Sequence, residues 1–123
     1  IGVIGQRLVR KLCPLCKTAR SAEAIEKKLL DIDEDTDITL HEAVGCDKCN
    51  NTGYKGRMSI LEVLRMDPEL DELIARKATL GELRRHTKSV GFRNLADDAT
   101  SRVLSGITSL DEISRVVDLT DRL

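Results

Sequence analysis

Aromatic residues are scarce in this sequence, and their scarcity limits both the core and the partners that the protein can have. Tyr54 and Phe92 are the only aromatic side chains, and tryptophan is absent. The core must therefore be built from leucine, isoleucine, valine and alanine, which suits helices. Sheets that recognise RNA and surfaces that stack bases need exposed aromatic rings, so the composition argues against both.

A strong net charge and a long apolar run are also missing. The 20 basic and 21 acidic residues give a formal charge of −1, which provides no overall attraction to DNA or to an anionic membrane. No apolar run approaches the roughly 20 residues that span a bilayer, and no signal peptide is visible. We therefore expect no nucleic-acid partner and no transmembrane segment. The opening stretch IGVIGQRLVRKLC, which lacks a methionine, suggests a segment of a longer chain.

Recognisable catalytic motifs are absent as well. The sequence has no phosphate loop of the form G-x-x-x-x-G-K-[ST], no G-x-G-x-x-G motif and no H-E-x-x-H motif. Asp97 and Asp98 are adjacent, so on a helix their directions differ by about 100° and they do not form an acid–base pair. We expect these two side chains to be solvated, and we assign no catalytic residue.

The sequence does contain two Cys-x-x-Cys pairs in separate parts of the chain. Two residues between thiolates allow one tight turn to place both sulfurs on the same ion, and two such turns complete a tetrahedron. A closed site of four thiolates favours Zn²⁺ in a structural role, with no open position for a substrate. The predicted zinc ligands are Cys13, Cys16, Cys46 and Cys49.

Disulfides and redox chemistry are the alternative uses of these cysteines. Disulfides are typical of exported proteins, and nothing in the sequence indicates export. A thioredoxin-like redox site needs one Cys-x-x-Cys within a βαβ unit, and that context is missing. His41 and His86 are the only histidines, and neither is needed once four cysteines fill the site. Measurement of bound metal would distinguish these alternatives.

Local patterns predict an α+β fold that is mostly helical. We expect a small tetracysteine zinc-binding subdomain with short strands, followed by a C-terminal helical bundle. Asp67, Thr79 and Thr108 are the expected helix caps, and Gly91 and Gly106 are expected to end helices. The predicted helices are 6–12 (the end of a helix), 18–30, 67–77, 79–90, 94–105 and 108–119, and the predicted strands are 38–44 and 57–64.

Three stretches of the sequence together resemble one known family. GQRLVRKLCPLCK, GCDKCNNTGYKGRMSILEVL and GFRNLADDATSRVLSGITSLDEISRVV resemble the C-terminal region of the type II secretion ATPases (general secretion pathway protein E) and of the type IV pilus assembly ATPases (PilB family). The resemblance covers nearly the whole chain, and the tetracysteine motif, the G-Y-x-G-R loop and the GITSLDEI ending are specific in combination.

The resemblance implies a part of a larger machine. Members of the family are cytoplasmic, Mg²⁺-dependent ATPases that act as hexamers at an inner-membrane platform and drive assembly of a pilus or pseudopilus. Their nucleotide-binding motifs would lie upstream of this segment, so the segment alone should not hydrolyse ATP. It would stabilise the motor and contact neighbouring subunits of the homohexamer or the platform proteins, at the periphery of the inner membrane.

The resemblance also implies roles for individual residues. The four cysteines hold zinc, and Arg57, in the G-Y-x-G-R loop, lies near the nucleotide or a subunit boundary. There its planar guanidinium could contact phosphate oxygens, as an arginine finger does. The other interpretation is a surface arginine paired with a nearby carboxylate. Arg7 and Arg10 are expected to pack or form salt bridges against the missing ATPase core.

We therefore expect three segments. Residues 1–12 are the end of the upstream ATPase core, 13–65 are the tetracysteine subdomain with a helical insert, and 66–123 are the C-terminal α-helical subdomain. The alternative is a free-standing zinc ribbon that binds nucleic acid or protein.

Overall fold

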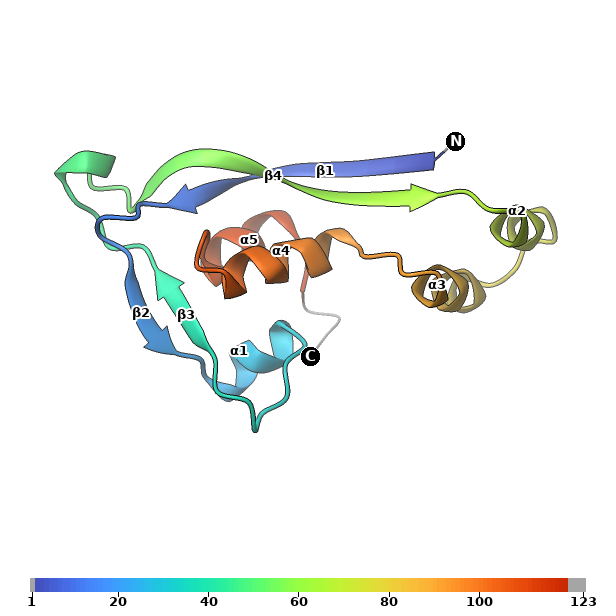
Figure 1. Ribbon diagram of the computed structural model, residues 1–123, viewed down its shortest axis with the longest axis horizontal. Coiled ribbons are helices and arrows are strands. Elements are labelled where there is room, and N and C mark those ends of the chain that lie inside the picture. Colours follow the sequence, from blue (N-terminus) through green and yellow to red (C-terminus); the bar gives the residue numbers. More distant parts are fainter. Residues whose placement is uncertain (1, 120–123) are drawn as a thin grey trace.

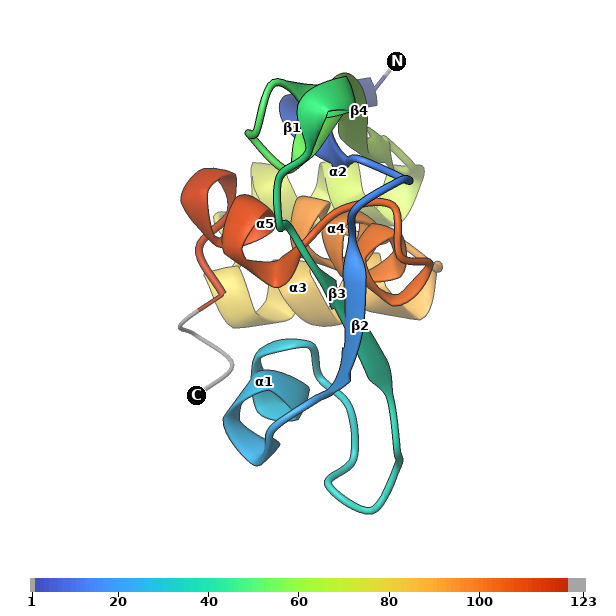
Figure 2. The same ribbon diagram turned by 90° about the vertical axis from the view of Figure 1, so that its left-hand side faces the viewer.

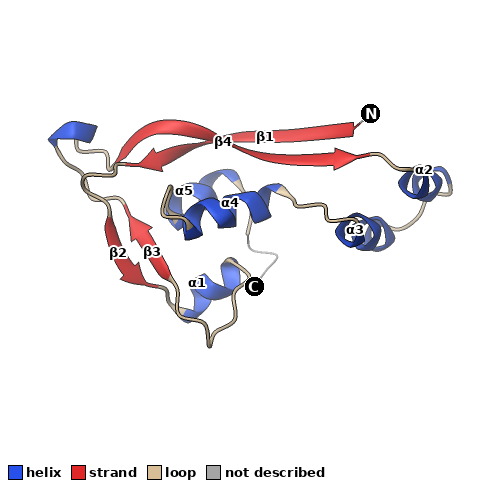
Figure 3. Ribbon diagram, viewed as in Figure 1, coloured by secondary structure: helices blue, strands red, loops and turns tan. Residues whose placement is uncertain are grey.

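A computed structural model describes residues 2–119 and shows an α+β fold (Figure 1). Residue 1 and residues 120–123, which belong to the first and last predicted segments, lie outside the described residues. The elements, distinguished by type in Figure 3, are β1 (Gly2–Leu12), β2 (Thr18–Ser21), α1 (Ala24–Leu29), β3 (Thr39–Glu42), a 3₁₀ turn (Asp47–Cys49), β4 (Tyr54–Arg65), α2 (Pro68–Ala75), α3 (Leu80–Ser89), α4 (Leu95–Leu104) and α5 (Leu110–Val116).

The strands form two separate antiparallel ribbons. β1 pairs with β4, and β2 pairs with β3. The long ribbon runs along one side of the molecule, while β2–β3 and α1 project from the body beyond α4 and α5 (Figures 1 and 2). The register of the long ribbon is regular until it becomes irregular between Arg10 and Leu12.

The helix end predicted at 6–12 is wrong, because this segment is part of β1. Its apolar residues fit a helical spacing, but neighbouring residues of a strand face opposite sides of the ribbon. Val9 accordingly faces the core and is 1% exposed, whereas Leu8 faces outward and is 52% exposed. Pairing with β4, about 50 residues away in the chain, decides the conformation.

The single helix predicted at 18–30 is also wrong, because the chain forms β2 before α1 begins. β2 pairs with β3, and this pairing holds residues 18–21 in an extended conformation. The side chains of Glu23 and Glu26 form a capping box that starts the helix at Ala24. Arg20 forms ion pairs with Glu26 and Glu42, which ties the short ribbon to the helix.

The later helices form close to where the sequence predicts them. Asp67, Thr79 and Asn94 accept backbone N–H groups at the starts of α2, α3 and α4, as expected for N-caps. The predicted cap Thr108 is wrong, and Ser109 caps α5 instead. Thr108 is fully buried, and its hydroxyl donates to the carbonyl oxygen of Arg10 at 2.7 Å. Among residues 2–119, no helix is both long and apolar enough to cross a bilayer.

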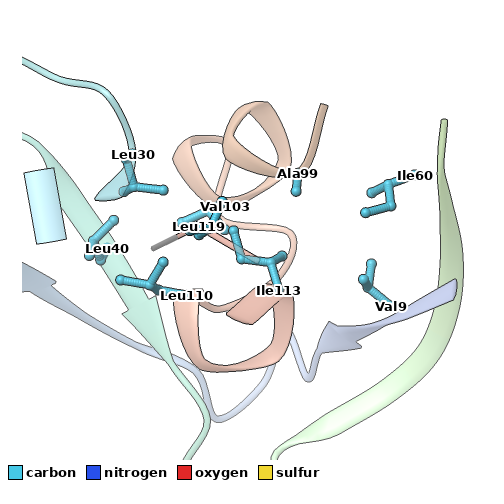
Figure 4. Packing of buried hydrophobic residues seen from close by; sticks show 9 residues of the cluster. All are labelled: Val9, Leu30, Leu40, Ile60, Ala99, Val103, Leu110, Ile113 and Leu119. Carbon is cyan, nitrogen blue, oxygen red and sulfur yellow. The ribbon is translucent and has the colours of Figure 1, made fainter. Parts of the chain in front are cut away.

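The core lies between the long ribbon and helices α4 and α5, and it extends to β3 and α1. These aliphatic side chains meet across elements that are far apart in sequence (Figure 4). Ile60, Val103 and Ile113 are each 0% exposed. The buried cluster consists of Val9, Leu30, Leu40, Ile60, Ala99, Val103, Leu110, Ile113 and Leu119.

A polar network fastens α5 to the long ribbon at the edge of this core. The carboxylate of Glu112 accepts the backbone N–H of Arg10 at 2.7 Å and its guanidinium at 2.9 and 3.1 Å. The same guanidinium lies 4.2 Å from the centre of the Tyr54 ring, whose hydroxyl is 2.6 Å from the Ser109 hydroxyl. Arg10 therefore pairs within this chain, which corrects the expectation that it would face a missing core.

Candidate metal centre

The four cysteines occupy the junction where the two ribbons meet. Cys13 follows β1 and Cys16 precedes β2, so the first pair forms the turn between these strands. Cys46 and Cys49 flank and end the 3₁₀ turn that joins β3 to β4. β1 and β2 adjoin the first cysteine pair, and β3 and β4 adjoin the second. Because β1 pairs with β4 and β2 pairs with β3, the two cysteine pairs are brought together.

The sulfur atoms are arranged as a tetrahedral metal site requires. All four Sγ atoms lie within 4.8 Å of one another. Cys13–Cys46 and Cys16–Cys49 Sγ atoms are 3.8 Å apart, and Cys46–Cys49 Sγ atoms are 3.7 Å apart. Metal–sulfur bonds of about 2.3 Å place tetrahedral sulfurs about 3.8 Å apart. The observed distances match this value and are far longer than a disulfide bond of about 2.05 Å.

Backbone amides point at the sulfurs and favour their negatively charged form. The Gly45 N–H donates to Cys16 Sγ at 3.3 Å. The N–H groups of Cys46 and Gly53 donate to Cys49 Sγ at 3.2 and 3.3 Å. Hydrogen bonds to a thiolate stabilise it relative to the thiol, so each of these amides by itself favours the ligand form of the sulfur that it contacts.

The pKa values of Cys13, Cys16 and Cys49 are shifted in different directions. Burial alone would raise the pKa of Cys49, but the amides of Cys46 and Gly53 outweigh it and lower the pKa to about 6. The Leu15 amide chiefly lowers the pKa of Cys13. The Gly45 amide lowers the pKa of Cys16, but burial and the other thiols outweigh it and raise this pKa to about 11. Metal binding must therefore displace protons from part of the site.

Two glycines allow the chain to turn tightly around the second cysteine pair. Gly45 has a φ of +117°, and a Cβ atom there would lie 2.9 Å from the carbonyl oxygen of Asn51. Gly53 has a φ of +82°, and a Cβ atom would lie 2.5 Å from the Cβ of Ala43. Both positions require glycine, because a side chain would be strained and would collide with the neighbouring turn.

The donor set fits a closed structural site. Cys13 and Cys49 are buried, while Cys16 and Cys46 are partly exposed. Four thiolates complete a tetrahedron and suit a thiophilic ion, so no coordination position is left for a substrate. The site can therefore support the fold, but it leaves no open coordination position for a substrate.

Neither histidine belongs to the sulfur cluster. His86 Nε2 lies 3.0 Å from both carboxylate oxygens of Asp67, and its Nδ1 lies 3.4 Å from Glu69. His41 packs near Gly106, and its Nδ1 has no hydrogen-bond partner among residues 2–119. The four sulfurs form the cluster without either ring.

Arg57 lies on β4, opposite Arg10 and outside the sulfur cluster. Its side chain is exposed and forms no ion pair with another described residue. The carboxylate nearest to this cross-strand pair belongs to Glu112, which is bound to Arg10.

Sequence reasoning missed the structural use of several acidic side chains. Asp97 completes a capping box with Asn94, and Asp98 accepts the Leu61 N–H of β4 at 2.8 Å. These contacts overturn the expectation that both aspartates are merely solvated. The capping spacing of Asn94 and Asp97 was readable in the sequence, whereas the contact of Asp98 depends on tertiary packing.

Comparison with known proteins identifies relatives over most of the chain. The model of the type II/IV secretion system protein family matches residues 1–115. The chain is 41% identical over 116 residues to the type II secretion system ATPase E of Vibrio cholerae, and covers 23% of that protein. It is 39% identical over 124 residues to the type IV pilus assembly ATPase TfpB of Acinetobacter baylyi, and covers 21% of it.

A third relative gives the same picture. The type II secretion system protein E of Pseudomonas aeruginosa is 40% identical over 116 residues. The alignments to the Vibrio, Acinetobacter and Pseudomonas proteins cover 94%, 98% and 94% of this chain. The chain thus spans less than a quarter of the length of each of these relatives, which are 21–23% covered.

Proposed function

The chain belongs to the type II/IV secretion system protein family, and we propose that it is the zinc-binding and helical C-terminal region of a secretion or pilus-assembly ATPase. In this role it stabilises the motor and offers contact surfaces to neighbouring subunits. The observation that carries the proposal is the cluster of four sulfurs within 4.8 Å, which joins both ribbons at one point.

We propose Zn²⁺ as the ion, held by Cys13, Cys16, Cys46 and Cys49. A bound zinc ion supplies coordination energy and no open position for chemistry. Because a preformed site does not exist in the unfolded chain, this binding energy becomes folding energy. In the short ribbon only Leu40 is buried, and zinc fixes this ribbon to the end of the long ribbon.

We also propose the division into three segments that the resemblance implies. Residues 1–12 end the upstream ATPase core, residues 13–65 form the zinc subdomain, and residues 66–123 form the helical subdomain. ATP and Mg²⁺ bind in the full-length parent, whose remaining part carries the phosphate loop. The segment alone, which has no such loop, does not hydrolyse ATP.

The outer face of the long ribbon supports contact with the upstream core. Ile4 and Val63 are paired across the ribbon, and they are 70% and 53% exposed. Leu8 and Leu61, on the same face, are 52% and 43% exposed. A two-stranded ribbon with an exposed apolar face is marginal in water, so a covering layer would stabilise it. We assign that covering layer to the upstream core.

We propose that Arg57 contacts nucleotide phosphate or a neighbouring subunit in the assembled parent. Its exposure and its lack of an ion pair among the described residues support this role. An arginine held beside another cation, here Arg10, gains from a partner of negative charge. In the full-length parent, Arg57→Ala should lower ATPase turnover while Arg57→Lys lowers it less, and unchanged turnover in both variants would refute the role.

We further propose that the parent is a homohexamer that acts in the cytoplasm at the periphery of the inner membrane. Its partners there are the platform proteins of a secretion or pilus machine. The names of the relatives, which are ATPases of type II secretion and of type IV pilus assembly, support a role in a secretion or pilus machine. The alternative of a free-standing zinc ribbon that binds nucleic acid or protein has less support, because the family match extends over residues 1–115 and not only the cysteine region.

The proposed function is tested in the full-length parent by removing one ligand. Cys46→Ser should abolish zinc binding and lower both ATPase turnover and secretion or pilus assembly. Lys48→Gln, in the same 3₁₀ turn but not a sulfur ligand, is the matched control and should behave as wild type. Normal turnover and normal assembly in a zinc-free Cys46→Ser protein would contradict the proposal.

A further inference from the structure

A pocket that three lysines line lies beside the tetracysteine site. Its volume is about 420 Å³. Lys11, Lys17 and Lys55 line it together with the apolar side chains of Leu12, Pro14 and Ile107. The whole chain has a net charge of −1, so this concentration of positive charge is local.

The three lysines reach the pocket from separate elements. Lys11 is at the end of β1, Lys17 follows Cys16, and Lys55 is at the start of β4. The ammonium group of Lys17 donates to the carbonyl oxygen of Gly106 at 2.8 Å, which fixes its position. Among residues 2–119, none of the three forms an ion pair with a carboxylate.

The strand register brings like charges together at this end of the ribbon. Arg10 is directly opposite Arg57, and Lys11 lies at the irregularity that faces the Lys55–Gly56 segment. A Cβ atom at Gly56 would lie 3.9 Å from the Lys11 side chain, which therefore passes over β4. Like charges across a ribbon are destabilising, and only Arg10 has a described carboxylate partner, Glu112. An anion bound in the pocket would relieve this repulsion.

We propose that this pocket binds a phosphate group, carried either by a soluble phosphate ester or by a lipid headgroup. Ammonium groups bind phosphate as point charges, and three lysines line the pocket. Leu12, Pro14 and Ile107 provide an apolar wall for the carbon part of an ester. The site is separate from the sulfur cluster and does not depend on the proposed role in an ATPase.

Titration of the zinc-loaded chain with pyrophosphate tests the proposal directly. Amide signals in NMR spectra should shift at Lys11, Lys55 and Ile107 and stay unchanged in α2 and α3. The affinity should fall with increasing salt, because the attraction is electrostatic. Absence of saturable shifts around the pocket, or equal shifts over the whole surface, would overturn the proposal.

A charge-matched pair of variants separates the pocket from general electrostatics. Replacing Lys11, Lys17 and Lys55 with glutamine should weaken pyrophosphate binding at least roughly tenfold, since three charge contacts are lost. The control replaces Lys28, Lys77 and Lys88, which lie outside the pocket, and should change binding less than roughly twofold. Equal losses in both variants would mean diffuse charge only and would refute a site.

Two checks keep this test valid if the triple variant is unstable. Zinc content of each variant shows whether the sulfur site is intact, because Lys17 adjoins Cys16. The single variants Lys11→Gln and Lys55→Gln remove side chains that make no described hydrogen bond, so they should fold and still weaken binding. Unchanged binding in both single variants, with zinc bound, would contradict the proposal. It would indicate that the lysines only offset the negative charge of the thiolate site.

Vesicles distinguish the two sources of phosphate. Flotation with phosphatidylserine vesicles is compared with flotation on phosphatidylcholine vesicles. Capture that pyrophosphate and the pocket variant both abolish assigns the site to a lipid headgroup. Pyrophosphate binding without capture assigns it to a soluble ester. If pyrophosphate does not bind and capture is insensitive to the pocket variant, the proposal fails.

Discussion

The two ends of the long ribbon carry regions that are held in different ways. At one end, the sulfur cluster, the Arg10–Glu112 pair and the aliphatic core join elements that are distant in sequence. At the other end, α2 and α3 pack mainly on each other (Figure 1). Leu70 is the buried residue of α2, and none of α3 is buried. The ribbon, with 11 and 12 residues per strand, separates them by roughly 35 Å.

This difference indicates a rigid body with a loosely held helical pair. The body combines buried apolar area with bonds between residues up to 102 positions apart. The α2–α3 pair relies on caps and on the link between His86 and Asp67, and it leaves Ile74, Leu80 and Val90 exposed. Regions with few buried contacts open locally at low free energy. We therefore expect hydrogen exchange to be slow in the body and fast in α2 and α3.

Removal of the metal should have the largest effect on this contrast. Structural zinc contributes about 10 kcal/mol or more, which is comparable to the whole stability of a small domain. After chelation, amide exchange should accelerate most in β2, β3 and the adjoining ends of β1 and β4. Exchange in α2 and α3, already fast, should change least. Added Zn²⁺ should restore protection where Mg²⁺ does not. Equal acceleration of amide exchange in the body and in α2–α3 would contradict the proposed difference between the two regions.

The second test compares one isoleucine from each region. Ile113→Ala leaves a cavity under the ribbon and should lower the free energy of unfolding by about 2–5 kcal/mol. Ile74→Ala, in α2, removes the same atoms from a side chain that is 51% exposed and should change it by less than about 0.5 kcal/mol. Urea denaturation measures both. Similar losses would show that α2–α3 belongs to the same cooperative core.

The third test weakens the ion pair between Arg10 and Glu112, which joins α5 to the long ribbon. Glu112→Gln weakens the bonds to Arg10 and should cost about 2 kcal/mol in urea denaturation near neutral pH. Its matched control is Asp111→Asn, next to it on the exposed side of α5, which should have little effect. A loss no larger than that of the control would show that the pair does not secure α5.

The stabilisation that the Arg10–Glu112 pair provides should depend on pH in one direction. Burial raises the pKa of Glu112, but the Arg10 guanidinium and N–H outweigh it and lower the pKa below its usual value. The stabilisation is therefore full above the unfolded-state pKa of about 4.3 and is lost as pH falls through the lower folded-state value. The difference between wild type and Glu112→Gln should shrink below about pH 4. A constant difference would contradict this assignment.

The smallest effect should come from the link within the helical pair. The Leu70 N–H, and then the His86 ring, lower the pKa of Asp67. The Asp67 carboxylate therefore stabilises the fold above the usual aspartate pKa, and this stabilisation is lost in acid. Asp67→Asn keeps a good helix cap but removes the charge beside His86. Exchange in α2 should accelerate by less than roughly tenfold, with the body unchanged. Asp71→Asn is the control, and a global effect would contradict the local role.

The same contrast explains what the sequence could predict. Asp67 and Thr79 cap α2 and α3 as predicted, and α4 begins beside Asn94, near the predicted position, because capping is a local property that nearby residues determine. The approach of the four cysteines also followed from spacing and ligand chemistry, although their ion remains a prediction. These features depend on a few neighbouring residues or on one coordination rule.

Contacts between residues that are distant in the sequence could not be predicted in the same way. Residues 6–12 carry apolar spacing that fits a helix, and only the partner strand β4 makes them extended. Arg10 and Glu112 are 102 residues apart, so nothing local marks them as a pair. Thr108 was the expected cap of α5, but its hydroxyl is used by the ribbon and the next residue, Ser109, takes the role.

Elemental analysis of the purified chain, combined with thiol alkylation, tests the central claim most directly. If Cys13, Cys16, Cys46 and Cys49 hold one ion, the protein should contain one zinc per chain. Its thiols should then resist alkylation until a chelator removes the metal. A folded, metal-free protein in which all four thiols react at once would contradict the account.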